Sequence, residues 1–210
     1  MPFSLVIFSM AFAVSCTAYN FLDVKPIDLY GLPLTAAFML VAVSYIISDC
    51  ITELFGRKIM MKVLISTIIM HLVVICFSQL GCSFTPSNDW ELNDAYLAII
   101  GQSPKVALLS AFAFLCGTTT NTLIMSFLKY LWKDKYFKAR AFLSTIAGEF
   151  IDCCAYLPIM FWGVLPFSEI WDMIVLFTTS KCIIEAVVLP ITHRVVNYFK
   201  NDHNSLNVLC

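Results

Sequence analysis

Charged residues are scarce in this chain of 210 residues. Lys, Arg, Asp and Glu make up 13% of it, about half the share found in an average globular domain. Apolar residues make up 60% of the chain, and its mean hydropathy is +0.85. A water-soluble domain of this length cannot bury so much apolar surface, so the composition predicts a membrane protein with several spans. The net charge of −1 indicates no particular partner.

Motifs for catalysis and cofactor binding are also missing. There is no His-Glu-x-x-His, no glycine-rich phosphate loop and no Gly-x-Ser-x-Gly, and the three histidines are not paired in the sequence. The nine cysteines form no Cys-x-x-Cys and no zinc-ligand spacing. Most of them lie within apolar runs, where cysteine behaves as a small hydrophobic residue. We therefore expect no enzymatic activity, no cofactor and no metal site.

Apolar runs long enough to cross a bilayer occur six times. They each contain about 17 to 24 residues, the length that a hydrocarbon core of roughly 30 Å requires. Their positions are 3–21, 32–50, 63–80, 105–128, 142–163 and 172–191. The first run has no basic residue before it, unlike a cleaved signal peptide, and is predicted to remain as a helix. The fold class is therefore all-α, a single transmembrane domain over residues 1–210 with six helices.

The basic residues indicate the orientation of these helices. Ten of the thirteen lie in the second connection, in the fourth connection or in the C-terminal tail. By the positive-inside rule these three segments are cytoplasmic, so both termini are predicted to be cytoplasmic. The basic residues lie near helix ends, where they face anionic lipid, and we expect no nucleic-acid partner.

Two segments outside the predicted spans have distinct expectations. The connection at 81–104 lies on the outer side and is predicted to form a short lid or interfacial helix, with Trp90 and Tyr96 as anchors at the membrane interface. The polar tail at 200–210 is predicted to be mobile.

Charged residues inside the last two spans are the main functional signal. Glu149 and Asp152 share one stripe of a helix with Tyr156, and Lys181 and Glu185 share a stripe of the next helix. Each charge at that depth costs about 2.5 to 3.5 kcal/mol on insertion scales, so each needs a partner or a polar cavity. Counting a rise of 1.5 Å per residue, Asp152 and Lys181 lie at a similar depth and form the natural ion pair, while Glu149 and Glu185 lie near one another.

Three carboxylates and one ammonium leave an excess of negative charge in this region. Either one or more of the carboxyls hold a proton, or a cation is present. A proton-coupled carrier or a carrier for a positively charged solute would explain the excess. The alternative is a structural salt bridge, with protonated glutamates that hold the helices together.

Three other polar features lie in or beside the predicted spans. Asp49 and Glu53 are four residues apart at the cytoplasmic end of the second run, where they either join the site or emerge into water beside Arg57. Asn121 lies in a polar patch of the fourth run, a composition that often joins membrane helices. Pro158 predicts a kink or a break in the fifth helix.

Several stretches, taken in order, resemble the queuosine-precursor transporter family, also called the VUT family. The resemblance rests on SDCITELFGRK at 48–58, IIGQSPKVALLSAF at 99–112, GEFIDCCAYLPIMFWG at 148–163 and SKCIIEAVVLPITHRVVNYFK at 180–200, together with Asn20 in CTAYNFLDVKP. It extends over nearly the whole chain. The matching motif positions are Asp49, Glu53, Gly56, Gly148, Glu149, Asp152, Lys181, Glu185 and Pro190.

The resemblance implies import of a 7-deazaguanine base across a bacterial-type inner membrane, for the synthesis of queuosine in tRNA. A guanine-like edge offers two adjacent N–H donors, which one carboxylate of Glu149 or Asp152 can accept. Phe150, Tyr156, Phe161 and Trp162 are candidates for stacking, and of these Tyr156 shares the stripe of the carboxylates. The candidate substrate-binding residues are Glu149, Asp152, Tyr156, Lys181, Glu185, Asp49, Glu53 and Asn121. The alternative is a substrate-binding membrane subunit of an ATP-driven vitamin-type importer. The base, the coupling ion and the oligomeric state stay open.

Overall fold

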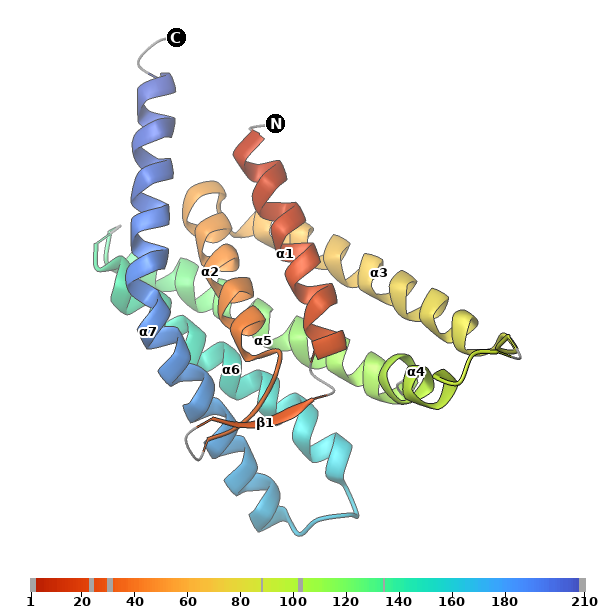
Figure 1. The fold of residues 1–210 in the computed structure, drawn as a ribbon. Coiled ribbons are helices and arrows are strands. Elements are labelled where there is room, and N and C mark those ends of the chain that lie inside the picture. The colour runs from red at the N-terminus through yellow and green to blue at the C-terminus, as the bar shows by residue number, and fades with distance from the viewer. Residues whose placement is uncertain are drawn as a thin grey trace.

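A computed structural model describes residues 3–22, 25–29, 32–87, 89–101, 104–133 and 135–207 of the chain. This part of the chain forms seven helices and one β-hairpin (Figure 1). The elements are α1 (Phe3–Leu22), β1 (Pro26–Leu29), β2 (Leu32–Thr35), α2 (Phe38–Phe55), α3 (Arg57–Cys82), α4 (Asn93–Ile100), α5 (Pro104–Leu131), α6 (Phe137–Phe161) and α7 (Phe167–Asn207). The prediction of an all-α fold is therefore confirmed, with a small hairpin added.

Five of the seven helices are long and apolar enough to cross a membrane, which makes the chain a multi-pass membrane protein. They are α1, α3, α5, α6 and α7. The predicted runs lie within α1, α3, α5 and α7, while the run at 142–163 extends two residues beyond the end of α6 at Phe161. The remaining run corresponds to α2, in which some side chains lie outside the described residues. A sixth span formed by α2 therefore stays a prediction.

The start of the second helix was predicted wrongly. The run at 32–50 was expected to be helical throughout, but Leu32–Thr35 form a strand that pairs antiparallel with Pro26–Leu29, and α2 begins only at Phe38. Pro33 favours an extended conformation for the residue before it and cannot donate a hydrogen bond within a helix. The hairpin thus closes the connection between α1 and α2.

Both ends of the described chain lie at the same end of the molecule. Figure 1 shows α1 beginning and α7 ending there, together with the connection from α2 to α3 and the one from α5 to α6. A core of buried residues, which includes Phe12, Ile51, Met60 and Val196, joins six helices in this half. The ring of Phe8 packs edge-on against that of Phe199, with centroids 5.0 Å apart. We call this the terminal end of the bundle.

Two glycines allow α5 and α6 to pack at very short range. A Cβ added to Gly117 would lie 2.8 Å from the Cβ of Asp152 and 2.9 Å from the carbonyl oxygen of Gly148. A Cβ added to Gly148 would lie 2.9 Å from the Cβ of Asn121. Small residues permit this approach of helix backbones in membranes. The approach places Asp152 against Gly117 and Asn121 against Gly148 on the shared face.

Three further expectations concern the helix ends. The connection at 81–104 contains the short helix α4, in which Tyr96 packs against Trp90 with ring centroids 5.6 Å apart, so the expected short helix is present. No break occurs at Pro158, because α6 continues through it and ends one turn later, at Phe161. α7 continues to Asn207; the mobility expected of residues 200–210 stays a prediction, and residues 208–210 lie outside the described part.

Candidate functional site

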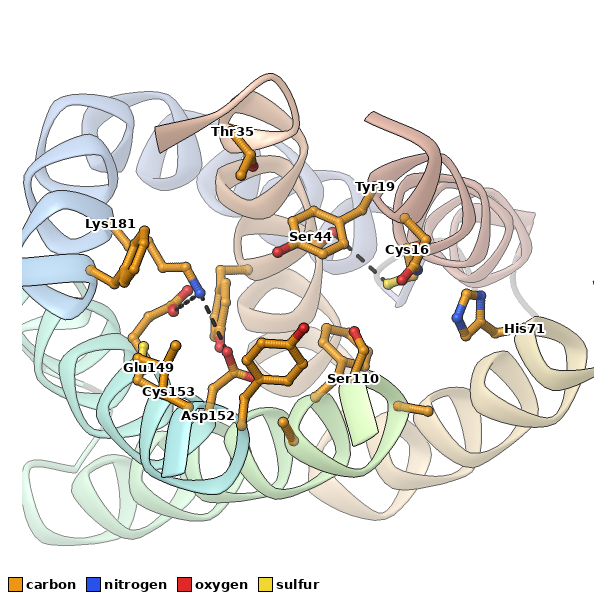
Figure 2. Close-up of a pocket in the computed structure, with 18 of the residues that line it drawn as sticks. Cys16, Tyr19, Thr35, Ser44, His71, Ser110, Glu149, Asp152, Cys153 and Lys181 are labelled. Carbon is orange, nitrogen blue, oxygen red and sulfur yellow. Dashed lines mark hydrogen bonds and ion pairs between the residues drawn. The ribbon is translucent and has the colours of Figure 1, made fainter. Parts of the chain in front are cut away.

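A cavity of about 280 Å³ lies among α1, α2, α3, α5, α6 and α7 (Figure 2). Its walls include Asn20 near the end of α1, Phe161 at the end of α6 and Met173 near the start of α7. These three positions belong to the half of the bundle away from the terminal end. The volume is near the lower limit of the roughly 300–1,000 Å³ found for small-molecule pockets, so it suits a compact solute.

Three charged side chains meet in the wall of this cavity. The Nζ atom of Lys181 lies 2.7 Å from Oε2 of Glu149 and 3.3 Å from Oδ2 of Asp152. Figure 2 shows the lysine extending from α7 between the two carboxylates of α6. The predicted pair of Asp152 and Lys181 is therefore present, but Glu149 forms the shorter contact. The turn of α6 explains this result, since residues three apart lie on the same face and both reach one ammonium.

The three charged side chains differ in how far they are exposed. The side chain of Glu149 is 1% exposed, whereas those of Lys181 and Asp152 are 19% and 22% exposed. Tyr45 of α2 is also buried and lies within hydrogen-bonding reach of Glu149. Glu149 is thus held from two sides, while Lys181 and Asp152 present polar atoms to the cavity.

The rest of the wall is aromatic and weakly polar. The aromatic members are Tyr19, Tyr45, Phe114, Tyr156, Phe161 and Phe177, and the smaller polar members include Asn20, Thr35, Ser44, Thr67, His71 and Ser110. Of the predicted stacking residues, Tyr156 and Phe161 line the cavity. Phe150 and Trp162 do not: the ring of Phe150 packs against Trp171 outside the cavity, and Trp162 is 79% exposed.

Four predicted site residues do not line the cavity: Asp49, Glu53, Asn121 and Glu185. Three of them form a buried layer. Nδ2 of Asn121 donates a hydrogen bond of 3.1 Å to Oδ1 of Asp49. Glu185 is one helical turn beyond Lys181 and acts electrostatically on both Asp49 and Glu149. We call Asp49, Asn121 and Glu185 the middle layer.

The fourth, Glu53, belongs to an ion-pair cluster nearer the terminal end. Arg140 of α6 donates two hydrogen bonds to its carboxylate, of 2.9 and 3.2 Å, and both side chains are 0% exposed. Nζ of Lys129 lies 3.4 Å from the same carboxylate and donates to the backbone carbonyl of Glu53. We call Glu53, Arg140 and Lys129 the terminal cluster. The alternative that Asp49 and Glu53 emerge into water beside Arg57 is wrong: both acidic side chains are buried, Arg57 is exposed, and the partner of Glu53 is Arg140.

One face of α2 connects the cavity with both deeper clusters. Tyr45, Asp49 and Glu53 are spaced four residues apart, so they form one stripe with steps of about 6 Å. Tyr45 approaches Glu149, Asp49 contacts Asn121, and Glu53 pairs with Arg140. The buried polar groups therefore form a continuous column from the cavity to the terminal end.

Sequence reasoning missed several of these residues. Tyr45 and Ser44 lie one turn before Asp49 on α2, so the stripe through Asp49 could have identified them. Tyr19 and Asn20 are polar residues at the end of an apolar helix, which is also a usable signal. Arg140 had no such signal, because it lies in a basic segment and was counted among the exposed cytoplasmic charges.

The donor atoms of Glu149, Asp152 and Cys153 all lie within 4.8 Å of one another, a spacing that a metal ion accepts. The ammonium of Lys181 already contacts two of these three residues, so it supplies the positive charge that a metal would bring. The eight cysteines of the described part are free thiols.

A bundle of apolar helices with a charged and aromatic cavity in its interior is the architecture of a membrane transporter. Residues 35–195 match the family described as "Putative vitamin uptake transporter", and the chain belongs to this family. It is a transporter and not an enzyme. The chain is 24% identical over 198 residues to a Bacillus subtilis (strain 168) protein named "Probable queuosine precursor transporter", an alignment that covers 93% of this chain and 85% of that protein. No solved structure matches the chain.

Proposed function

We propose that this protein imports a queuosine precursor, a 7-deazaguanine base such as the cyano form, the aminomethyl form or queuine. The membrane would be a bacterial inner membrane, and an ion gradient would drive the import. The observation that carries the proposal is the placement of Glu149, Asp152 and Lys181 together in the wall of one compact cavity. The name of the Bacillus subtilis relative supports the same solute class.

The chemistry of the cavity suits such a base. Asp152 is partly exposed to the cavity and accepts the ring N–H and exocyclic amine of a guanine-like edge as a bidentate pair. Lys181 donates to the neighbouring carbonyl oxygen of the same edge. Tyr156 and Phe161 are placed in the wall, where their rings can stack on the flat heterocycle. The two carboxylates exceed the one ammonium by one negative charge, which favours an aminomethyl base in its cationic form.

The orientation belongs to the same proposal. The basic connections from α2 to α3 and from α5 to α6 lie at the terminal end, beside the start of α1 and the end of α7 (Figure 1). With α2 as the sixth span, the positive-inside rule makes this end cytoplasmic. The cavity then lies in the outer half of the bundle, where it receives solute from outside.

Rescue of tRNA queuosine tests the proposal. Cells that make no queuosine precursor would express the wild-type chain, Asp152→Asn, Glu149→Gln or the control Asp172→Asn, whose carboxylate is exposed on α7. They would be supplied with each of the three labelled bases, and queuosine in tRNA would be measured. We expect rescue by the wild type and by Asp172→Asn, and at least a tenfold lower rate in the two cavity variants at equal membrane expression. Full rescue by both cavity variants, or none by the wild type with any base, would overturn the proposal.

Uptake by the purified chain in liposomes without ATP distinguishes this function from the alternative of a subunit that needs an ATP-driven partner. Accumulation of unchanged base under an ion gradient alone is the expected result. Uptake that appears only after an ATPase subunit is added would favour the alternative.

A further inference from the structure

The middle layer contains two buried carboxyl groups without a counter-ion. Asp49 is 0% exposed and Glu185 is 2% exposed. Within the described part of the chain, Oδ2 of Asp49 and both carboxyl oxygens of Glu185 have no hydrogen-bond partner. Oδ1 of Asn121 is likewise buried without a donor. Buried acceptors are costly unless a donor satisfies them, so these four oxygen atoms need an explanation.

The basic groups nearest to this layer are already engaged elsewhere. Arg140 donates two bonds to Glu53 and a third, of 3.0 Å, to the backbone carbonyl of Lys135. Lys129 contacts the carboxylate and the backbone carbonyl of Glu53. Lys181 lies between Glu149 and Asp152 in the cavity wall. None of the three has a hydrogen bond or ion pair to Asp49 or Glu185 in the regions that the structure describes.

Apart from Arg140, the titratable groups around the two carboxyls are acidic. Those that act on Asp49 are Glu185 of α7, Glu53 of α2 and the guanidinium of Arg140 of α6, which Glu53 already neutralises. Glu185 faces Glu149 of α6. Two thiols complete the surroundings: Cys50 beside Asp49 and Cys182 beside Glu185. The layer therefore carries an excess of negative charge if both carboxyls are ionised.

We propose that Asp49 and Glu185 hold a transported proton, and that this proton couples the protein to a proton gradient. The inference rests on the proposed import function and assigns its driving ion. A carboxyl group that binds a proton gains an O–H donor. That donor satisfies an orphaned oxygen of the layer, such as Oδ1 of Asn121, while the Asn121 amide continues to donate to Asp49. The proton is bound from the cavity side and released toward the cytoplasm, with no other bond made or broken.

The position of the layer suits coupling. Glu185 is one turn from Lys181, which we place on the solute, and Asp49 is one turn from Glu53 in the terminal cluster. A change in the charge of the layer therefore acts on the cavity and on the terminal cluster over short distances in a low-dielectric interior. Gain or loss of the proton therefore changes the electrostatic energy of Lys181 in the cavity and of Glu53 in the terminal cluster.

Uptake in liposomes with imposed gradients tests the proton site. The purified chain would be reconstituted as wild type, Asp49→Asn, Glu185→Gln, Glu185→Asp and the control Asp172→Asn. Labelled 7-cyano-7-deazaguanine would be the probe, under an inward gradient of one pH unit or an inward sodium gradient. With one proton per neutral base, we expect about tenfold accumulation in the wild type and in Asp172→Asn. Glu185→Asp, which keeps a carboxyl group, should retain part of it.

The two neutral variants should lose this accumulation but keep exchange of internal for external base without a gradient. Exchange shows that they are folded and still bind the solute. Accumulation in Glu185→Gln and Asp49→Asn equal to that of the wild type would overturn the proposal, and so would a wild type driven by sodium and not by protons.

Infrared spectroscopy gives a readout that does not depend on the solute. In wild-type protein at neutral pH, the carbonyl stretch of a protonated carboxyl group should be present, and the double variant Asp49→Asn/Glu185→Gln should lack it. Absence of this band from the wild type would overturn the proton site even if the base is transported. Failure of the wild type to exchange any base, with the band present, would instead overturn the proposed import function.

Discussion

The cavity and the terminal cluster both pair basic with acidic side chains, but in opposite proportions: one ammonium meets two carboxylates in the cavity, and two basic groups meet one carboxylate in the terminal cluster. In the cavity, Lys181 contacts two carboxylates and all three groups belong to a wall that a solute can reach. In the terminal cluster, Arg140 binds one carboxylate through two parallel hydrogen bonds, and neither side chain is exposed. Lys181 can therefore exchange a carboxylate for a solute, whereas the pair of Arg140 and Glu53 is closed to solute and solvent.

The choice of cation accounts for the difference. A guanidinium is planar, always charged and matched to a carboxylate in two places, so it forms a pair with a fixed geometry. An ammonium is a compact charge on a flexible stem, which can leave one acceptor for another. The comparison indicates that the terminal cluster is a structural link between α2, α5 and α6. Lys181, by contrast, is available to a solute.

The largest expected effect comes from breaking the closed pair. Arg140→Met removes the two-bonded partner of the Glu53 carboxylate and leaves that carboxylate buried beside the partly exposed Lys129. We expect the free energy of unfolding in detergent to fall by about 3–5 kcal/mol, because an uncompensated charge is left in the interior. Thermal unfolding at fixed detergent concentration would measure this change.

The double variant Arg140→Met/Glu53→Leu is the control for that prediction. Since it removes both charges, it should be more stable than the single variant. Equal stability of Arg140→Met and the wild type would contradict the interpretation of this pair as a structural one.

The second prediction applies the same change to the cavity. Lys181→Met should weaken binding of the imported base by about 10- to 150-fold, as expected for loss of a hydrogen bond to a charged group worth about 1.5–3 kcal/mol. Its effect on unfolding should be smaller than that of Arg140→Met, because Lys181 and Asp152 are partly exposed and the buried Glu149 keeps Tyr45 within hydrogen-bonding reach. Equilibrium binding and thermal unfolding would be compared for the two variants. A larger loss of stability in Lys181→Met than in Arg140→Met would contradict the assignment of Arg140 to structure and of Lys181 to solute binding.

The third prediction concerns the packing that places the cavity carboxylates. Gly117→Ala adds a Cβ that meets Asp152 and the backbone of Gly148 at less than 3.0 Å, so α5 and α6 must separate. We expect a loss of about 1–3 kcal/mol of stability, together with weaker binding of the base. The control Leu123→Ala changes a side chain of α5 that is 44% exposed, and binding should not change. Unaltered unfolding and binding in Gly117→Ala would show that the helices can adjust.

The smallest effect is expected at Asp172, which lies on α7 but outside both clusters. Its carboxylate is exposed, so Asp172→Asn should alter the free energy of unfolding by no more than about 0.5 kcal/mol and leave uptake unchanged. A loss of uptake in this variant would mean that acidic residues of α7 act through the overall field and not through specific contacts.

Much of the fold could be predicted because the bilayer limits the choices. Apolar runs of fixed length mark the helices, and charges within them mark α6 and α7 as the source of the site. The hairpin before α2 could not be predicted in this way, because Leu32–Thr35 are as apolar as a helix and hydropathy does not register Pro33 or the pairing with β1. Hydropathy alone does not distinguish an apolar strand from the first turn of a membrane helix.

Side-chain partners were harder to predict than helices. Helix spacing placed Glu149 and Asp152 on one face, and both do contact Lys181. The burial of Arg140 could not be deduced, since its neighbours in the sequence are typical of a cytoplasmic loop and its partner lies 87 residues away. Likewise, Asp49 of α2 and Asn121 of α5 are 72 residues apart in the sequence, and the spacing along either helix does not indicate that they meet.

The length of α7 has a practical consequence for determining an experimental structure. At 41 residues it is about 60 Å long, roughly twice the thickness of the hydrocarbon core. Its last turns therefore extend beyond the membrane as an uninterrupted helix at the terminal end (Figure 1). A rigid helical partner fused in register with those turns would follow the orientation of the bundle. Such a fusion would give electron microscopy an alignment feature outside the detergent micelle, which this small membrane protein otherwise has little mass to provide.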